Sequence, residues 1–374
     1  MRWEKTTTER LINEGLLKIG DGYRAKNSEF TPTGLPFARA GNINNGFLFS
    51  NADRLPEYYK EVVGDKTSEL GDIVFTSKGT VGRFGFVTEK IQKFVYSPQL
   101  CFWRSLKKDK IIPKFIYYWM HGAEFVGQAE VLKGQTDMAD YVNLADQRKM
   151  QITLPLPSEQ KAIASVLSSL DDKIDLLHRQ NATLEGMAEA LFRQWFVVEA
   201  KEDWEEKRLG DFFPVKTGKK DANYSVEYGG YPFFTCSKQT LCAPDYSFDG
   251  SAILLAGNGD FNVKRYSGKF EAYQRTYVLI PYTENDFNFL YVIIKFFLHE
   301  ITEGHRGSVI NFITKGMIED FTIAMPPDNI MPKLNYFNKI YAKIDANIQQ
   351  IRTLEILRDA LLPKLISGDV HITY

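Results

Sequence analysis

Apolar side chains recur in steps of four and three residues along two long segments of the chain. The first segment keeps this spacing without a break through Ile163, Leu167, Leu170, Ile174, Leu177, Asn181, Leu184, Ala188, Leu191 and Trp195. The second keeps it, with more polar interruptions, through Lys333, Phe337, Ile340, Ile344, Asn347, Ile351, Leu354, Arg358, Leu361 and Leu365. Such spacing is typical of a coiled-coil seam, in which each helix buries one stripe against a partner. The pattern predicts two long helices that form an antiparallel coiled coil, with Asn181 opposite Asn347 as a polar layer.

Local signals indicate where the two helices begin and end. Ser158 is a suitable N-cap for the first helix, and Glu159 lies in the first turn, where the helix dipole favours an acid. The second helix is expected at roughly residues 330–366, because Ser367 and Gly368 form a stop signal and Pro363 disturbs only the last turn. The alternative of two unrelated helices in separate cores does not account for their shared heptad phase.

The two helical segments also repeat each other in sequence. Residues 173–175, 183–185 and 190–191 recur at 343–345, 353–355 and 360–361, always at an offset of 170 residues. Weaker similarity lies upstream, where Trp3-Glu4 matches Trp204-Glu205 and residues 34–37 match 230–233, but there the offset drifts. Loops tolerate insertions better than packed elements do. We therefore expect a pseudo-twofold internal repeat, with helices of fixed length and globular parts of variable length.

Each globular part is expected to be a mixed α/β (α+β) domain. In the first, strands at 72–76 and 83–87 flank a glycine turn at 77–82; in the second, a strand at 252–256 leads into a glycine turn at 257–260, followed by strands at 263–266 and 276–280. Aromatic-rich segments at 115–120 and 289–294 are expected to be buried helices in equivalent places. The predicted organisation is a first domain at 1–157, a long helix at 158–202, a second domain at 203–327 and a C-terminal long helix at 328–374.

Composition and charge limit the classes of function. The 374 residues are 44% hydrophobic, which is enough for two ordinary cores, and no apolar run reaches bilayer-spanning length. A cytoplasmic location without membrane contact is therefore expected. Cys101, Cys236 and Cys242 are too few for a zinc site or a disulfide framework, so they are interpreted as buried free thiols.

The charge is close to balanced, with a net value of −1. Residues 1–157 carry 22 basic against 18 acidic side chains, whereas residues 158–203 carry 5 against 9. Non-specific DNA binding depends on neutralising phosphates, so a chain of this balance should bind DNA poorly alone. If DNA is the target, a partner is expected to supply much of the contact with phosphates.

The sequence shows no catalytic motif. It lacks a phosphate-binding glycine loop with Lys-Ser/Thr, a dinucleotide fingerprint and the Asn-Pro-Pro-aromatic site of adenine methyltransferases. Pro244-Asp245 is interpreted as a turn rather than the start of a nuclease motif, and His299 and His305 lack nearby ligands at metal spacing. We expect no catalytic residues, no metal and no cofactor.

Polar loop residues are the remaining candidates for function. Arg and Lys pair with guanine, and Asn and Gln pair with adenine, although any solvated loop carries such residues. The candidates for contacts to DNA are Lys78, Thr80, Arg83, Lys133, Gln135, Thr136, Lys219, Lys220, Lys238, Asn258, Lys264, Arg265 and Arg306. Gln274 and Arg275 lie against a predicted strand and are left as structural residues.

These features together resemble a known family. Two domains each open near Trp-Glu and Gly-x-Pro-Phe, carry a glycine turn, and lead into a long helix, the first through Leu-Pro-Leu-Pro-Ser-Glu-Gln at 154–160. Over essentially the whole chain, the sequence is similar to the specificity subunit of type I restriction-modification systems. The second copy departs from the pattern, because residues 325–329 read Met-Pro-Pro-Asp-Asn and lack the Glu-Gln.

The resemblance implies a DNA-binding subunit without catalysis of its own. Each domain would be a target recognition domain that reads one half of a split sequence in double-stranded DNA, and the helices would separate the domains. Two methyltransferase (modification) subunits would bind the helices and bring S-adenosylmethionine, and restriction subunits would add ATP-driven translocation and cleavage. Two alternatives stay open: a coiled-coil scaffold that joins two protein-binding domains without touching DNA, and an enzyme whose catalytic residues are not recognisable.

The helices further predict the geometry of the target. The segment from Ile163 to Trp195 would span about 50 Å at roughly 1.5 Å per residue, which corresponds to at most about 15 base pairs. Because the domains should dock inward of the helix tips, a separation of roughly 10 base pairs between the centres of the two recognised blocks is expected.

Overall fold

The computed structural model describes residues 3–44, 46–79, 81–133, 141–303, 311–327 and 331–372. The chain divides into two compact units. Unit 1 comprises Met1–Asp175 and Arg352–Tyr374, and unit 2 comprises Leu176–Ile351. In the described ranges, no helix is both long enough and apolar enough to cross a bilayer.

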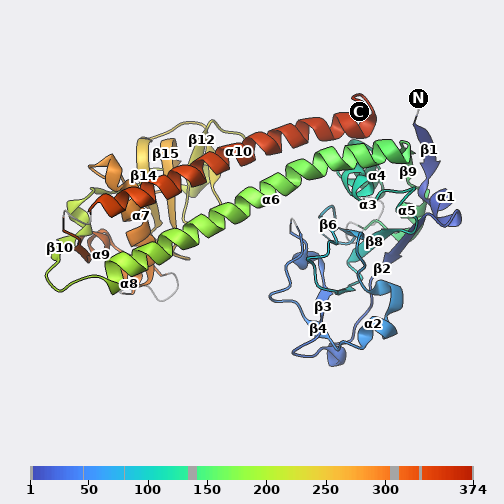
Figure 1. The fold of residues 1–374 in the computed structure, drawn as a ribbon, viewed down its shortest axis with the longest axis horizontal. Coiled ribbons are helices and arrows are strands. Elements are labelled where there is room, and N and C mark those ends of the chain that lie inside the picture. The colour runs from blue at the N-terminus through green and yellow to red at the C-terminus, as the bar shows by residue number, and fades with distance from the viewer. Residues whose placement is uncertain are drawn as a thin grey trace. The chain divides into compact units, whose positions relative to one another are not determined.

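Unit 1 contains a four-stranded antiparallel sheet in the order β2 (Leu17–Asp21), β8 (Leu100–Ser105), β5 (Ile73–Thr76) and β6 (Phe84–Phe86) (Figure 1). A second sheet has the order β4 (Arg54–Leu55), β3 (Leu35–Ala38) and β7 (Val95–Tyr96), and β1 (Glu4–Thr7) pairs with β9 (Gln151–Leu154). The helices are α1 (Thr8–Asn13), α2 (Tyr59–Val62), α3 (Pro113–Met120), α4 (Ala123–Lys133) and α5 (Leu144–Lys149). Strands β5 and β6 and helix α3 confirm the predicted strand, glycine turn, strand and aromatic helix.

The core of unit 1 lies between the four-stranded sheet and α3. Trp103 of β8 and Trp119 of α3 are fully buried with ring centroids 5.8 Å apart, and Phe125 lies 5.3 Å from Trp119. Strand β8 is buried at every position, and its one cation, Arg104, donates to both carboxylate oxygens of the buried Asp72 at 2.7 and 2.8 Å. This pairing lets a charged residue lie inside a fully buried strand.

Unit 2 contains a six-stranded mixed sheet in the order β11 (Val215–Thr217), β16 (Thr276–Leu279), β14 (Phe248–Ala256), β15 (Val263–Ala272), β12 (Tyr231–Phe234) and β13 (Leu241–Ala243). Its other elements are the pair β10 (Glu205–Arg208) and β17 (Thr322–Met325) and the helices α7 (Phe287–Phe296), α8 (Leu298–Thr302) and α9 (Lys315–Glu319). Ile253 and Leu279 from the sheet join Phe289 of α7 in one buried cluster. Helix α7 therefore confirms the second predicted aromatic helix.

The two long helices are α6 (Pro157–Arg193), followed by a π-helical turn at Gln194–Val198, and α10 (Leu334–Ser367). The prediction of Ser158 as N-cap is wrong, because α6 already begins at Pro157, whose fixed φ suits the first helical position. The Glu159 carboxylate instead accepts from the backbone N–H of Leu156 at 3.2 Å. Helix α10 continues through Pro363 and ends before Gly368, which has φ +81°, as the stop signal predicted.

Within each unit, side chains of α6 and α10 contact one another. In unit 2, Asn347 Nδ2 donates to Asn181 Oδ1 at 2.8 Å, and the Tyr341 hydroxyl lies 3.3 Å from Glu185 Oε2. Partner numbers fall along α10 as they rise along α6, so the two helices are antiparallel in this unit and Asn181 lies opposite Asn347 as predicted. In unit 1, Arg358 Nη1 pairs with Asp171 Oδ1 at 3.1 Å.

The cysteines are only partly as expected. Cys101 on β8 is buried and free. Cys236 and Cys242 are free but half-buried, because they lie at the end and edge of the β12–β13 hairpin rather than in the core. The interpretation of all three as buried thiols is therefore wrong for these two.

Candidate nucleic-acid interface

Five loops of unit 1 are joined by short hydrogen bonds at the ends of its strands. They are residues 22–24 after β2, 39–42 after β3, 77–79 and 81–83 between β5 and β6, 97–99 before β8, and 141–143 before α5. The backbone N–H of Ser77 donates to Gln99 O at 2.9 Å, and that of Val142 donates to Ser77 O at 3.0 Å. The glycine turn and the segment before α5 are therefore neighbours, although they lie far apart in sequence.

Unit 2 joins five loops in the same way. They are residues 218–221 after β11, 235–239 after β12, 257–262 between β14 and β15, 273–275 between β15 and β16, and 311–313 before α9. Gly257 N–H donates to Arg275 O at 2.9 Å, and Ile313 N–H donates to Gly257 O at 3.0 Å. We call each set of five loops the loop cluster of its unit.

Four backbone hydrogen bonds recur at equivalent places in the two clusters. Besides the two just given for each unit, Ser97 N–H donates to Ala38 O as Tyr273 N–H donates to Phe234 O, and Leu100 N–H donates to Ser97 O as Thr276 N–H donates to Tyr273 O. Isolated bridges repeat as well, with Lys78 opposite Tyr141 in unit 1 and Asn258 opposite Phe312 in unit 2. The two clusters thus share one backbone framework and carry different side chains on it.

One glycine in each cluster is required by the closeness of the chains. A Cβ atom on Gly22 would lie 2.1 Å from the backbone oxygen of Ser97, and a Cβ on Gly218 would lie 2.1 Å from that of Ala272. Both distances are far inside van der Waals contact, and backbone atoms cannot move aside as flexible side chains can. The loop after β2 and the loop after β11 therefore depend on glycine for their place in the framework.

The described candidates of unit 1 fall into two groups. Lys78 and Arg83 are exposed in the loop cluster, with Lys78 Nζ 5.9 Å from the ring centre of Tyr141. Lys133 lies at the end of α4, where it pairs with Glu130 at 2.6 Å. Thr80, Gln135 and Thr136 lie outside the described residues.

Four described candidates of unit 2 lie in its loop cluster. Lys219 is exposed, Lys220 places its ammonium 4.2 Å from the ring centre of Tyr224, and Lys238 pairs with Asp260 at 3.1 Å. Asn258 is half-buried in the glycine turn. Arg306 lies outside the described residues.

Lys264 is partly enclosed by the same cluster. Its ammonium donates to the backbone oxygens of Ser237 and, at 3.4 Å, of Thr235. Burial lowers the pKa of Lys264, and the nearby Cys236 opposes this effect to a smaller extent. The side chain ties β15 to the loop after β12 and carries a charge that burial makes easier to lose.

Arg265 belongs to a different environment from the other candidates. Its guanidinium forms a two-point ion pair with Asp345 of α10 at 2.7 and 2.8 Å and lies 4.6 Å from the ring centre of Tyr341. Only 12% of the side chain is exposed. In the middle of the sheet, β15 turns Arg265 toward the helix, where it joins the sheet of unit 2 to α10. A direct contact of Arg265 with a base stays a prediction, and this ion pair would have to open for it.

Several exposed residues of the clusters were not among the sequence candidates, and three of them are Arg24, Gln99 and Arg275. Arg24 and Gln99 belong to unit 1, and Arg275, left as structural on sequence grounds, belongs to unit 2. Arg275 lies in the turn between β15 and β16, and its carbonyl rather than its side chain joins the framework. A composition signal could not have separated these residues from other surface cations and amides, because only the hydrogen-bonded framework places them together.

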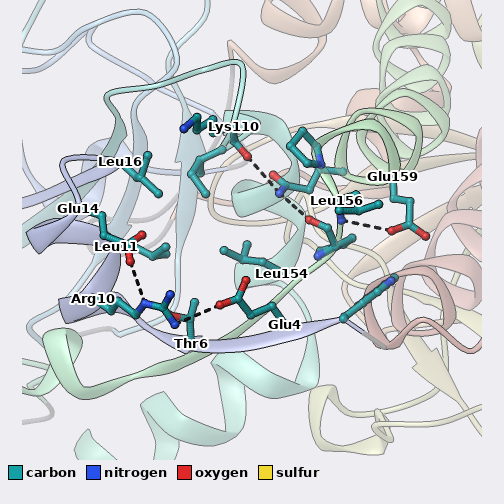
Figure 2. A pocket seen from close by; sticks show the side chains of 15 residues that line it. Glu4, Thr6, Arg10, Leu11, Glu14, Leu16, Lys110, Leu154, Leu156 and Glu159 are labelled. Atoms are coloured by element: carbon teal, nitrogen blue, oxygen red, sulfur yellow. Dashed lines mark hydrogen bonds and ion pairs between the residues drawn. The ribbon is translucent and has the colours of Figure 1, made fainter. Parts of the chain in front are cut away.

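A pocket of about 430 Å³ in unit 1 lies away from the loop cluster, at the base of α6 (Figure 2). Figure 2 shows Arg10 between two acids, paired with Glu4 at 3.1 Å and Glu14 at 2.8 Å. On the opposite side, Gln160 donates to the backbone oxygens of Pro155 and Lys110 at 2.9 and 3.2 Å. Arg10 is thus paired within the pocket lining, and none of the thirteen candidates lines the pocket.

Comparison with known proteins identifies the family. The model of the type I restriction modification DNA specificity domain matches residues 9–186 and 201–355. The EcoDI specificity subunit of a type I restriction enzyme from Escherichia coli is 40% identical over 173 residues, covering 45% of this chain and 39% of that protein. The MjaIX specificity subunit from Methanocaldococcus jannaschii is 26% identical over 349 residues, covering 81% of this chain and 78% of that protein.

A solved structure has the same fold. The type I restriction-modification S subunit from M. genitalium has a TM-score of 0.63 at 19% identity, covering 98% of this chain and 96% of that one. Two matches to the family model, one beginning in each globular part, agree with the loop framework that the two units share. The chain belongs to the family of the type I restriction modification DNA specificity domain.

Proposed function

We propose that this chain is the DNA-reading subunit of a type I restriction-modification complex, in which each unit reads one half of a split sequence in double-stranded DNA. The observation that carries the proposal is the framework of recurring hydrogen bonds with different side chains in the two clusters. A shared framework gives the same approach to DNA twice, and different side chains give two different sequences to read.

The charged and polar side chains of the clusters suit this role. Lys78, Arg83 and Lys219 are exposed cations on loops, and loop residues held by a rigid frame are where binding functions concentrate. Phosphate contacts would set the position on the duplex, and base contacts would set the sequence. The two recognition domains are proposed to comprise residues 1–157 and 203–327.

We further propose that α6 and α10 fix the spacing between the two recognised blocks and bind the modification subunits. The net charge of −1 supports a partner that contributes to phosphate binding. Methylation and cleavage would belong to modification and restriction subunits, and this chain would supply no catalytic group and no cofactor of its own. A cytoplasmic location would follow from that assembly.

The proposal is tested by expressing the chain with its cognate modification subunit in a methylation-free host and sequencing the methylated genome. We expect one split motif. Replacing residues 204–327 by the equivalent segment of a relative should then change one block of the motif and leave the other block unchanged. Methylation of no split motif, or a change in both blocks, would contradict the proposal and favour the scaffold alternative or coupled recognition.

A further inference from the structure

Gln99 and Arg275 occupy the same place in the two loop clusters. Each precedes the strand that pairs with the strand before the glycine turn, and each accepts at its backbone oxygen from the first residue of that turn, Ser77 or Gly257, at 2.9 Å. A second donor reaches the same oxygens: the hydroxyl of Ser77 at 3.4 Å and the thiol of Cys236 at 3.3 Å. The backbone at both positions is therefore held firmly while the side chains are exposed.

The two side chains present different chemistry from that common base. Arg275 carries a planar guanidinium, and no described residue pairs with it. On Gln99, the amide oxygen already accepts from the backbone N–H of Ala40 at 3.2 Å. Gln99 thus keeps its NH₂ group and one lone pair of an amide whose direction Ala40 fixes, whereas Arg275 keeps a complete fork of donors.

Major-groove base edges distinguish these two donors. A guanidinium fork matches the O6 and N7 acceptors of guanine with two bonds, whereas the two-bond contact of glutamine with adenine needs the amide oxygen as well as the NH₂ group. The bond from Ala40 uses one lone pair of the Gln99 oxygen and fixes the direction of the amide, so a single bond from the NH₂ group to a base acceptor is expected rather than the two-bond contact with adenine. Arg275 should therefore discriminate strongly between bases, and Gln99 only weakly.

Resting on the function proposed above, we infer that Gln99 and Arg275 are equivalent base-reading positions, that Arg275 specifies a guanine in the block read by unit 2, and that Gln99 makes a weaker single contact in the block read by unit 1. A matched two-bond contact gives about 5- to 150-fold discrimination against other bases. Discrimination at the Gln99 position should fall near or below the lower end of that range.

The test uses the chain with its cognate modification subunit and compares two exchanges, Arg275→Gln and Gln99→Arg, with the unchanged protein. The readouts are the methylated motif in the genome and binding of the complex to duplexes that differ at one base pair. Lys269→Gln is the matched control, because Lys269 is an exposed cation of unit 2 outside the five loops of the cluster, with its ammonium 4.7 Å from the ring centre of Tyr246. A melting curve for each variant verifies that the exchange leaves the fold intact.

We expect Arg275→Gln to relax one guanine in one block by about 5- to 150-fold, and Gln99→Arg to make one position of the other block select guanine. The control should leave both blocks unchanged. Unaltered motifs in both exchange variants, or an even loss of binding to all sequences, would overturn the inference, because the side chains would then contact nothing or only phosphate. If the unchanged chain and its partner methylate no split motif, the proposed function itself fails and the inference falls with it.

Discussion

Replacing one member of the polar pair Asn181–Asn347 should lower the stability of unit 2, whereas replacing both members should raise it. Asn347 is 1% exposed, its Nδ2 donates to Asn181 Oδ1 at 2.8 Å, and its own Oδ1 has no partner among the described residues. One buried acceptor is therefore already unsatisfied in the parent protein. A buried Asn pair of this kind fixes the register of paired helices at a cost in stability.

Replacing one member should not relieve that cost. Asn181→Leu would leave the whole Asn347 amide without its partner, a penalty of roughly 1–3 kcal/mol that the added apolar burial only partly offsets. Replacing both by Leu removes the penalty and buries two apolar side chains, so we expect the free energy of unfolding to rise by roughly 1–2 kcal/mol. For a unit of this size, that corresponds to about 2–8 °C in melting temperature.

The assay is thermal unfolding of the parent, both single variants and the double variant, analysed as a double-mutant cycle. Spin labels at the exposed Ala182 and Ala346, beside the pair in unit 2, report alignment. We expect the double variant to melt above the parent with a broader distribution of label distances. A double variant that does not melt above the parent, or an unchanged distance distribution, would refute the reasoning.

Four further predictions follow from other parts of the molecule. Inserting one heptad into both α6 and α10 should lengthen the unread gap of the motif by about three base pairs, because seven residues add about 10 Å. An unchanged gap in a folded, active variant would show that helix length does not set the gap. Lys78→Ala should cost roughly 1–3 kcal/mol and relax one base if Lys78 reads a base, but weaken all duplexes evenly if it touches phosphate; binding assays without either effect would remove it from the interface. Arg265→Ala should lower the melting temperature of unit 2 by breaking the ion pair with Asp345, while the methylated motif stays the same. A changed motif would show that Arg265 contacts a base. Burial lowers the pKa of His121 below its ordinary 6.5, so the unfolded chain binds a proton at a higher pH than the folded chain does. Unit 1 should therefore lose stability as pH falls through 6.5, and thermal unfolding of His121→Phe should lack this pH dependence.

The sequence predicts those parts of the molecule in which spacing is fixed by regular geometry. Helix periodicity and the constant offset of 170 residues place Asn181 opposite Asn347 without any knowledge of the fold. Strands β5, β6 and β14 were recognisable because their apolar runs end at glycine turns. In these elements, local pattern and tertiary packing agree.

The loop clusters could not be predicted to the same depth. Their equivalence rests on backbone hydrogen bonds between segments whose sequence offsets differ from loop to loop, so no single alignment of the halves brings Gln99 and Arg275 together. The side chain of Arg265 was assigned to DNA because a basic residue after a glycine turn has no sequence feature that shows which face of β15 it occupies. Its ion pair with Asp345 is made to a helix about eighty residues further along the chain, so no local pattern indicates it.

Gly22 and Gly218 are positions of the loop clusters that cannot be substituted, in contrast to neighbouring positions whose side chains can vary. At these two positions any side chain would collide with a backbone oxygen, whereas positions such as 99 and 275 hold their place through main-chain atoms that every residue possesses. If these positions read bases as proposed, mutational drift can exchange their side chains one at a time without passing through an unfolded intermediate. A lineage could acquire a new target sequence by single substitutions, and a combinatorial library that keeps the glycines fixed should remain largely foldable.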